Sequence, residues 1–372
     1  MEKIIKAAVD RGASDLHIKA GDVFRARIDG KLVALTKQAL TPEQTKAIAM
    51  RLIHNEEDRA RIDKLQDYDC SWGAAGIGRF RVNAFTQLGR IGIVLRVIQS
   101  NIPKFDELRL PPVMAELSMT KRGLIIMVGA TGSGKSTTLA SMIGHRNEHS
   151  YGHIVTIEDP VEYVHPHRNC IVTHREVGVD TASWEIALKN TLRQAPDVIL
   201  IGEIRDREAM DHAIAFAETG HLVMCTLHAN STNQALDRII NFFPEERRQQ
   251  LLMDLSLNLR ASVAQRLIPF KDRKGRIPAV ELMLNSPLIA DLIFKQEVHE
   301  IKEVMKRSRE QGMQTFDQSL YDLHETEQIS YEDALRNADS VNDVRLQIKL
   351  NSKLYGGVAG IHKGIEHLGL TG

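Results

Sequence analysis

Apolar and polar residues follow a period of two over much of the first hundred residues. The segment Gly78–Phe85 alternates in this way, which predicts a strand with one buried side and one solvent-facing side. The pair Asp29 and Gly30, between two short apolar runs, predicts a two-residue hairpin turn. Thr41–Gln44 carries the threonine, proline and glutamine that are typical of the beginning of a helix. Residues 1–100 are therefore predicted to form a small α+β domain.

From Val113 onward, short apolar runs alternate with helical stretches. The four strongest runs are Leu124–Val128, Ile154–Ile157, Val198–Ile201 and Leu222–Leu227. Because strands without a polar side must be covered on both faces, this pattern predicts a mostly parallel sheet between two layers of helices. After Pro244 the chain is predicted to be mainly helical, with one long helix over Glu245–Leu267.

The segment Asn101–Pro112 separates the two patterns. It contains three prolines among mixed charges, a composition typical of a linker. We therefore expect domains over residues 1–100 and 113–372, joined by residues 101–112. Residues 351–372 are rich in glycine and are predicted to form a flexible tail of the second domain.

Composition and charge exclude several classes of protein. Among 372 residues, Lys+Arg and Asp+Glu both total 48, so the formal net charge is zero. A nucleic-acid-binding protein usually shows a basic excess, so we expect no nucleic-acid partner. The widely spaced Cys70, Cys170 and Cys225 form no disulfide framework, which favours a cytoplasmic location. No apolar run reaches 18 residues, so no transmembrane segment is predicted.

The segment Gly129–Ser136 reads GATGSGKS and matches the phosphate-binding pattern G-x-x-x-x-G-K-[ST]. An apolar run precedes it and a helical stretch follows it, which is the context that the pattern requires. Its glycines let backbone N–H groups turn toward phosphate oxygens, and the helix adds its positive dipole end. Lys135 is predicted to reach the β- and γ-phosphates, and Ser136 to ligate Mg²⁺. The sequence therefore predicts binding of a nucleoside triphosphate with Mg²⁺.

Acidic residues follow the second and third apolar runs. Glu158, Asp159 and Glu162 follow the second, where a carboxylate can orient and deprotonate the attacking water. A solvated acidic turn is the alternative interpretation of these residues. Glu203 follows Ile201 by two positions, and a buried strand that ends in this way delivers a carboxylate to the Mg²⁺ shell. These acids indicate hydrolysis in addition to binding.

Histidines and arginines supply further candidates. His221 and His228 bracket the fourth apolar run, where each can donate to a phosphate or be an ordinary polar residue at a strand end. The spacing of the other histidines fits no metal site. Arg81 and Arg96 lie in strand-like segments of the first domain. An NTPase that hydrolyses at subunit boundaries needs an arginine from a neighbouring subunit, which makes these two arginines candidates for that role.

Together these residues resemble the secretion ATPase superfamily and, within it, the type IV pilus retraction ATPases of the PilT/PilU type. The resemblance covers nearly the whole chain. It rests on the segments GASDLHIKAG (12–21), GRFRVNAF (78–85), GATGSGKSTT (129–138), TIEDPVEYVH (156–165), TLRQAPDVILIGEIRD (191–206), AETGHLVMCTLHAN (217–230) and GMQTFDQSLYDL (312–323). Their combination is much more specific than any one of them alone.

The resemblance implies a PAS-like N-terminal domain joined to a RecA-like ATPase domain, assembled as a homo-hexameric ring. The implied nucleotide contacts are Gly129, Thr131, Gly132, Ser133, Gly134, Lys135, Ser136, Thr137, Glu158 and Asp159. The implied metal ligands are Ser136 and Glu203. The implied catalytic residues are Glu162, Glu203, His221, His228, Arg81 and Arg96. The implied output is withdrawal of pilin subunits through an inner-membrane platform protein, which gives twitching motility.

The chain departs from the PilT branch in its C-terminal part. Ala290 and Phe294 stand where that branch usually carries arginines. Residues 331–339 and 342–350 resemble the PilU branch, whose members look like accessory motors that work with a PilT partner. The chain lacks the tetracysteine zinc insert of the pilus assembly and type II secretion branches.

Three functions are compatible with a RecA-like core. The first is an ATP-hydrolysing retraction motor. The second is an accessory nucleotide-binding subunit that supports a paralogous motor and whose own hydrolysis is dispensable. The third is a nucleic-acid translocase, which the zero net charge disfavours. The complete set of Lys135, Glu162 and Glu203 favours the motor, because nucleotide binding alone does not require Glu162.

Overall fold

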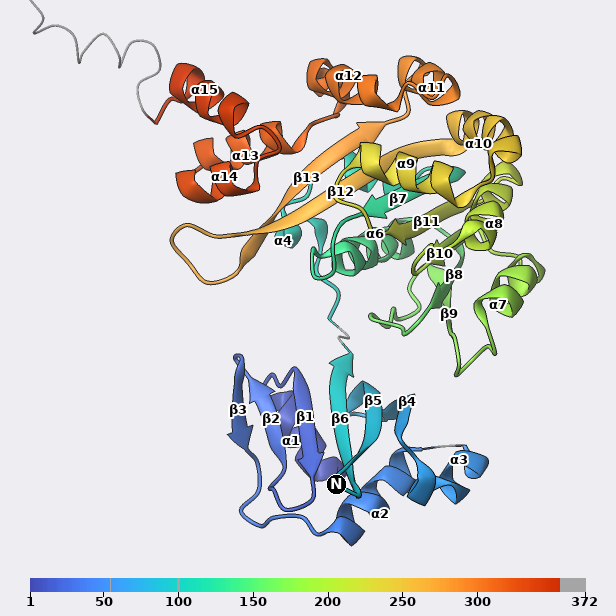
Figure 1. Ribbon diagram of the computed structural model, residues 1–372, viewed down its shortest axis with the longest axis vertical. Coiled ribbons are helices and arrows are strands. Elements are labelled where there is room, and N and C mark those ends of the chain that lie inside the picture. The colour runs from blue at the N-terminus through green and yellow to red at the C-terminus, as the bar shows by residue number, and fades with distance from the viewer. Residues whose placement is uncertain (54, 99–100, 355–372) are drawn as a thin grey trace, which may run out of the picture. The chain divides into compact units, whose positions relative to one another are not determined.

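The computed structural model describes residues 1–53, 55–98 and 101–354, and this part of the chain forms two compact units (Figure 1). The first unit contains Met1–Ile102 together with two later segments, Ile157–Pro166 and His174–Ala187. The second unit contains Pro103–Thr156, His167–Thr173 and the chain from Leu188 onward. Most of the predicted tail, from residue 355, lies outside the described residues.

The first unit is built on a six-stranded antiparallel sheet in the order β3-β2-β1-β6-β5-β4. Its strands are β1 (Asp15–Lys19), β2 (Arg25–Ile28), β3 (Lys31–Ala34), β4 (Asp67–Ala74), β5 (Gly78–Gln87) and β6 (Arg90–Ile98). Its helices are α1 (Glu2–Asp10), α2 (Pro42–Leu52) and α3 (Glu56–Ala60), with a 3-10 turn at Ile62–Lys64. Asp29 and Gly30 have φ angles of +48° and +78°, so the predicted hairpin turn is confirmed. The capping box at Thr41 and Gln44 is also confirmed.

Alternation along the strands explains the core of the first unit. On β5, the side chains of Phe80, Val82 and Ala84 are buried, and the residues between them are more exposed. Apolar residues of α1 and α2, including Ile5 and Leu52, belong to the same buried cluster. A strand period of two therefore gives this sheet one covered face and one face that carries polar side chains.

The second unit is built on a seven-stranded sheet in the order β13-β12-β7-β11-β10-β8-β9. Its strands are β7 (Gly123–Val128), β8 (Gly152–Glu158), β9 (Cys170–Glu176), β10 (Val198–Ile201), β11 (Leu222–Leu227), β12 (Leu259–Pro269) and β13 (Arg276–Leu284). The pairs β12–β7, β7–β11 and β11–β10 are parallel, and β13 is antiparallel to β12. The predicted mostly parallel sheet is therefore confirmed.

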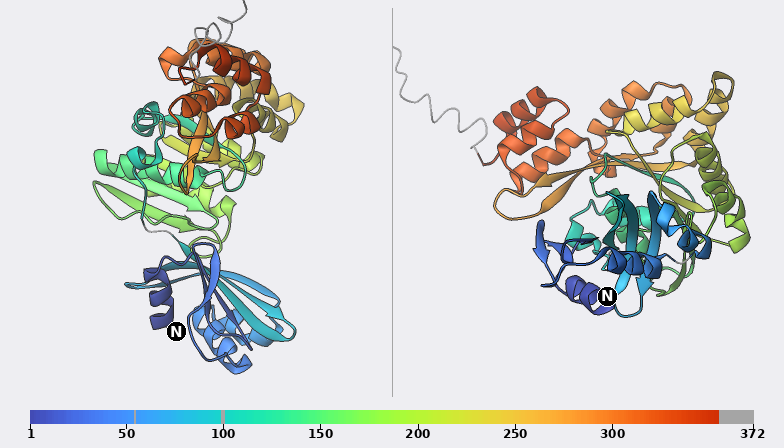
Figure 2. Two further views of the ribbon diagram at one scale, coloured as in Figure 1. Left: turned by 90° about the vertical axis from the view of Figure 1, so that its left-hand side faces the viewer. Right: turned by 60° about the horizontal axis from the view of Figure 1, so that its bottom comes forward.

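Helices precede, separate and follow the strands of this sheet. They are α4 (Phe105–Leu108), α5 (Val113–Ser118), α6 (Lys135–His149), α7 (Trp184–Thr191), α8 (Arg207–Glu218), α9 (Thr232–Phe242), α10 (Glu245–Asn258), α11 (Pro287–Phe294), α12 (Ile301–Arg307), α13 (Phe316–Glu325), α14 (Tyr331–Asn337) and α15 (Val341–Asn351). Three 3-10 turns lie at Leu192–Gln194, Val298–Glu300 and Arg309–Gln311. Every residue of β7 is buried, and both α6 and α8 contact this strand. The last three helices pack on one another, and α13 and α14 also contact the β12–β13 hairpin (Figure 2).

The predicted helix over Glu245–Leu267 is wrong in its second half. Helix α10 ends at Asn258, and strand β12 begins at the next residue. No glycine or proline marks this change, and leucine, alanine, arginine and glutamine are all good helix formers. Pairing with β7 on one side and β13 on the other overrides that local preference.

The predicted linker contains a short helix. Phe105 and Leu108 of α4 pack against the core cluster of the second unit, and α4 contacts α6. The segment is irregular on either side of α4, and the partly buried side chains of Phe105 and Leu108 attach α4 to the second unit.

Candidate functional site

The phosphate-binding loop predicted at Gly129–Ser136 joins the end of β7 to the beginning of α6. Gly134 is the N-cap of α6 and has a φ angle of +90°, a conformation that L-residues rarely adopt. A Cβ atom at this position would also lie 2.6 Å from the side-chain nitrogen of Gln265. The loop therefore needs a glycine here, both for its backbone conformation and for its packing.

Lys135 and Ser133 give this loop the properties of an anion site. The ammonium of Lys135 is folded over the loop and donates to the carbonyl oxygens of Gly129 at 2.7 Å and Ala130 at 3.0 Å. The Ser133 hydroxyl is buried and has no hydrogen-bond partner among the described residues. A buried polar group without a partner fits a ligand that supplies one. The loop therefore fits the phosphates of a nucleotide, with the positive end of α6 directed at them.

Gln265 braces the loop from the neighbouring strand β12. Its side-chain nitrogen donates to the carbonyl oxygen of Ser133 at 2.9 Å, and its side-chain oxygen accepts from the Thr138 hydroxyl at 2.8 Å. The side chain is almost fully buried. Sequence reasoning missed Gln265, because it placed this residue on a helix.

A cavity of about 330 Å³ opens beside Gly134 and Thr137. Its apolar lining includes Leu108, Leu267, Phe270, Ile277 and Pro278. The guanidinium of Arg273 lies 3.8 Å from the centroid of the Phe270 ring. An apolar cleft of this size next to a phosphate loop can take a nucleobase and its ribose. No sequence pattern indicated it, since its walls come from α4, β12 and β13.

Glu203 and His228 meet at the carboxyl edge of the sheet. Glu203 follows β10 and His228 follows β11, which are adjacent parallel strands. Nε2 of His228 lies 3.3 Å from Oε1 of Glu203, and Arg205 donates to the other carboxylate oxygen at 2.8 Å. Since β11 also pairs in parallel with β7, the loop of Lys135 follows the next strand at the same edge. The predicted acid, histidine and phosphate loop are therefore adjacent in one chain.

His221 lies at the opposite end of β11. Its Nδ1 is 3.0 Å from the carbonyl oxygen of Phe216 and 3.1 Å from the Thr219 hydroxyl. The six residues of β11 lie between it and His228, which puts the two seven steps apart, or about 23 Å at roughly 3.3 Å per residue. The structure therefore does not bring the two predicted histidines together.

The predicted acidic turn belongs to the first unit. Glu158 is the last residue of β8, and its Oε2 accepts from the backbone nitrogen of Glu162 at 3.4 Å. The backbone nitrogen of Val161 donates to Oε2 of Glu176 at 3.2 Å. The side chains of Asp159 and Glu162 are exposed. The turn is thus held by its backbone, which leaves the Glu162 carboxylate accessible.

Glu176 is a buried hub that sequence reasoning missed. Besides the Val161 nitrogen, its carboxylate accepts hydrogen bonds from Arg79 of β5 at 3.1 Å and from the hydroxyl of Ser71 on β4. These contacts connect the acidic turn to two strands of the six-stranded sheet. A buried carboxylate with several donors fixes the groups around it, because leaving any of them unpaired is costly.

Arg81 and Arg96 lie directly opposite each other on β5 and β6, and both are exposed. Neither makes an ion pair with any residue of the described chain. Like charges at directly opposite positions of a sheet destabilise it. On its other side Arg96 lies opposite Asp15 of β1, so the row of side chains across β5, β6 and β1 is Arg81, Arg96 and Asp15.

Among the helices of residues 1–53, 55–98 and 101–354, none has both the length and the apolar composition of a membrane span. No group of three or more His, Cys, Asp or Glu side chains there has the arrangement of a metal site.

Comparison with known proteins places the chain in a family. The family model described as "Type II/IV secretion system protein" matches residues 1–330. The chain belongs to this family. Among its curated relatives, the type IV pilus ATPase PilU of Pseudomonas aeruginosa is 58% identical over 354 residues, covering 95% of this chain and 92% of PilU. The type IV pilus retraction ATPase PilT of the same organism is 38% identical over 336 residues, covering 90% of this chain and 97% of PilT.

Solved structures agree with this assignment. The crystal structure of the pilus retraction motor PilT with bound ADP superposes with a TM-score of 0.86 at 40% identity, over 93% of this chain and 99% of PilT. The predicted family and the predicted fold class, a PAS-like domain with a RecA-like ATPase domain, are therefore confirmed. This member of the secretion family is a nucleotide-binding ATPase.

Proposed function

We propose that the chain is an ATP-hydrolysing motor that drives or assists retraction of type IV pili, the activity behind twitching motility. The observation that carries this proposal is the 58% identity to PilU across nearly the whole of both chains. The similarity to the PilT retraction motor with bound ADP supports it.

The site supports a division of roles among its residues. The phosphate loop holds the triphosphate through its backbone and Lys135, and the cavity beside Gly134 takes the adenosine. Mg²⁺ held by Ser136 and Glu203 would neutralise charge on the β- and γ-phosphates. Glu162 orients and deprotonates the attacking water. His228, 3.3 Å from Glu203, fixes the carboxylate and can donate to the γ-phosphate.

The assembly we propose is a homo-hexameric ring with domains over 1–100 and 113–372 and a connection over 101–112. In such a ring Arg81 and Arg96 reach the nucleotide of a neighbouring subunit, and their exposed, like-charged arrangement supports this role. The ring works at the cytoplasmic face of the inner membrane with a pilus platform protein. It also works with a paralogous retraction ATPase where one is present.

One experiment separates a motor from an accessory subunit whose own hydrolysis is dispensable. Pilus retraction is measured in cells that lack every other retraction ATPase, with the wild-type chain or with Lys135→Ala. Retraction by the wild type and none by Lys135→Ala is the expected result, because the ammonium contacts the phosphates. Lys121→Ala, an exposed lysine before β7, is the matched control and should retract normally.

A different pair of results would support the accessory function. If the wild type does not retract alone, and Lys135→Ala restores full retraction when a paralogous motor is added back, hydrolysis by this chain is dispensable. The accessory function would then replace the motor.

A further inference from the structure

Three charged side chains from other elements form hydrogen bonds with the backbone of residues 228–232, the segment that follows β11. Arg238 donates to the carbonyl oxygen of His228 at 2.6 Å. Arg266 donates to the carbonyl oxygen of Asn230 at 3.3 Å. The backbone nitrogen of Thr232 donates to the buried carboxylate of Glu281 at 2.8 Å. The position of His228 beside Glu203 thus depends on residues of α9, β12 and β13.

Arg266 connects this loop to the C-terminal helices. One of its terminal nitrogens donates to the carbonyl oxygen of Asn337 at 2.6 Å, and the other donates to Asp339 at 2.8 Å as well as to Asn230. Its guanidinium also lies 3.9 Å from the centroid of the Phe316 ring of α13. A planar guanidinium with several fixed partners holds them in one geometry, which a lysine cannot do.

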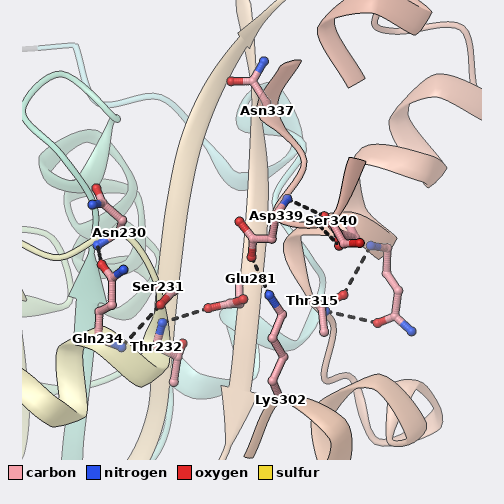
Figure 3. A network of polar contacts seen from close by, with 12 residues as sticks. Asn230, Ser231, Thr232, Gln234, Glu281, Lys302, Thr315, Asn337, Asp339 and Ser340 are labelled. Atoms are coloured by element: carbon pink, nitrogen blue, oxygen red, sulfur yellow. Dashed lines mark hydrogen bonds and ion pairs between the residues drawn. The ribbon is translucent and has the colours of Figure 1, made fainter. Parts of the chain in front are cut away.

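Asp339 lies in a turn that is itself well fixed. The turn joins α14 to α15, and Asp317 of α13 accepts from the backbone nitrogens of Asp339 at 2.7 Å and Ser340 at 3.1 Å. Lys302 of α12 donates to the second carboxylate oxygen of Asp339 at 2.6 Å (Figure 3). Burial opposes ionisation of Asp339, but the contacts with Lys302 and Arg266 outweigh it and lower its pKa. The carboxylate is therefore charged at neutral pH.

Glu281 provides a second connection between the C-terminal helices and the segment that follows His228. Glu281 of β13 lies between the backbone of Thr232 and the side chain of Lys302, with which it interacts electrostatically (Figure 3). Burial raises the pKa of Glu281. The beginning of α9 and the turn that contains Asp339 are thus connected through two adjacent strands, β12 and β13.

We propose that Arg266 and Asp339 are positioning residues for ATP turnover. Their ion pair ties the loop that follows His228 to helices α13–α15, so that a displacement of these helices moves His228 relative to Glu203. The proposal rests on the role proposed for His228.

Gln265, which precedes Arg266 on β12, predicts which kinetic constant the Arg266 contacts should affect. Gln265 braces the phosphate loop, and Arg266 holds the loop that follows His228. Successive side chains of a strand point to opposite faces, so these two contacts are made on different sides of β12. Loss of the Arg266 contacts should therefore change the His228 loop and leave the phosphate loop in place. This separation predicts an effect on kcat without one on nucleotide affinity.

The test uses the full-length protein with Asp339→Asn, which removes the charge and keeps the shape. ATP turnover, equilibrium binding of a fluorescent ATP analogue and the thermal unfolding midpoint are measured together. We expect kcat to fall about three- to tenfold, which lies within the range of couplings carried by such networks. The dissociation constant of the analogue should change by less than about twofold. Asp339→Glu, which keeps the charge, should recover most of the lost turnover.

A second ion pair, which also connects the β12–β13 hairpin to the C-terminal helices, provides the matched control. Lys271 and Glu327 form an exposed ion pair at 3.5 Å between the segments that follow β12 and α13, without contacting the His228 loop. Glu327→Gln should leave all three measurements unchanged. The proposal is overturned if Asp339→Asn turns over ATP at the wild-type rate. It is also overturned if turnover, affinity and thermal midpoint all fall together and Asp339→Glu recovers none of them.

His228→Ala, measured in parallel, separates this inference from the proposed site. If His228→Ala leaves kcat unchanged, the role of His228 is wrong and the inference falls with it. If His228→Ala lowers kcat and Asp339→Asn does not, the site stands and only the connection to the C-terminal helices is wrong. If both lower kcat and the double variant is no worse than His228→Ala alone, the two residues act through one path.

Discussion

The two sheets carry their candidate functional residues in different places. In the seven-stranded sheet, Lys135, Glu203 and His228 all follow the ends of strands. In the six-stranded sheet, Arg81 and Arg96 lie in the middle of strands. Burial explains the difference, because β7 and β11 are buried at every position and leave room for polar groups only beyond their ends. Strand β5 alternates and therefore has an open face.

We propose that this difference separates a group of residues that one chain holds together from a pair of arginines that acts on a neighbouring chain. At the strand ends, His228 has Glu203 as a partner and Lys135 has the carbonyl oxygens of its own loop. Arg81 and Arg96 lie opposite each other and form no ion pair within the described part of the chain, although Asp15 of β1 lies opposite Arg96 on its other side. Loss of Glu162 tests whether the proposed catalytic residues act as one site, and loss of Arg81 or Arg96 tests whether the arginines act between subunits.

The largest effect is expected from Glu162→Gln. The amide cannot accept a proton from the attacking water, so turnover should fall by about 10²- to 10⁴-fold. ATP binding should be retained, because the phosphate loop and the cavity are unchanged. Turnover by phosphate release and affinity by fluorescent nucleotide binding are the two measurements.

Glu185→Gln is the matched control for this prediction, since Glu185 is an exposed glutamate of α7. It should behave as the wild type. Unaltered turnover in Glu162→Gln would remove Glu162 from the catalytic role and leave the acidic turn as a solvated surface feature.

Residues that are local in sequence could be predicted, and residues brought in by pairing could not. The phosphate loop and Glu203 each adjoin an apolar strand in the sequence, so their place at the sheet edge follows from the pattern alone. Gln265 contacts the loop across 132 residues of sequence from Ser133, and only the β12–β7 pairing brings it there. The same holds for the cavity, whose lining residues come from four separate segments.

The fold shows the same division. The hairpin at Asp29 and Gly30 and the helix that begins after Thr41 have local signals, and both were predicted. Strand β4 (Asp67–Ala74) carries few β-branched residues and was not predicted. It forms because β5 offers it a complete ladder of eight paired positions. Strand pairing of this kind has no local signal in a single sequence, so the pattern alone cannot predict it.

A smaller effect is expected from Arg81→Ala and from Arg96→Ala. Turnover should fall by about ten- to a hundredfold in each, less than for loss of a sole arginine finger because the second arginine remains. Nucleotide binding should be retained. Arg90→Ala, an exposed arginine at the beginning of β6, is the control and should have normal turnover.

Mixing subunits tests whether these arginines act between chains. Arg81→Ala subunits keep an intact strand-end site, and Glu162→Gln subunits keep intact arginines. In mixed rings, some boundaries combine both intact parts, so turnover should exceed the sum of the separate variants. No gain on mixing, in rings shown to exchange subunits, would place the arginines and the nucleotide in the same subunit.

The smallest effect is expected from His165, a buried residue whose effect on stability arises within one chain. His165 is 5% exposed, and its ring stacks on His174 with 5.7 Å between centroids. Burial, followed by the proximity of His174, lowers the pKa of His165 to about 3. An unfolded histidine has a pKa of about 6.5, so the unfolded chain takes up this proton first as the pH falls. His165 therefore stabilises the fold above pH 6.5 and loses that contribution between pH 6.5 and 3.

Urea unfolding of the wild type and His165→Asn at pH 7 and pH 5 measures this contribution. The free-energy difference between the two proteins should shift by about 2 kcal/mol over this interval, in favour of the variant at pH 5. His299→Asn, an exposed histidine, should show no comparable shift. Because the effect arises within one chain, it should not depend on protein concentration, whereas complementation by the arginines must. A His165 shift that vanishes on dilution would contradict this distinction between burial within a chain and contact between chains.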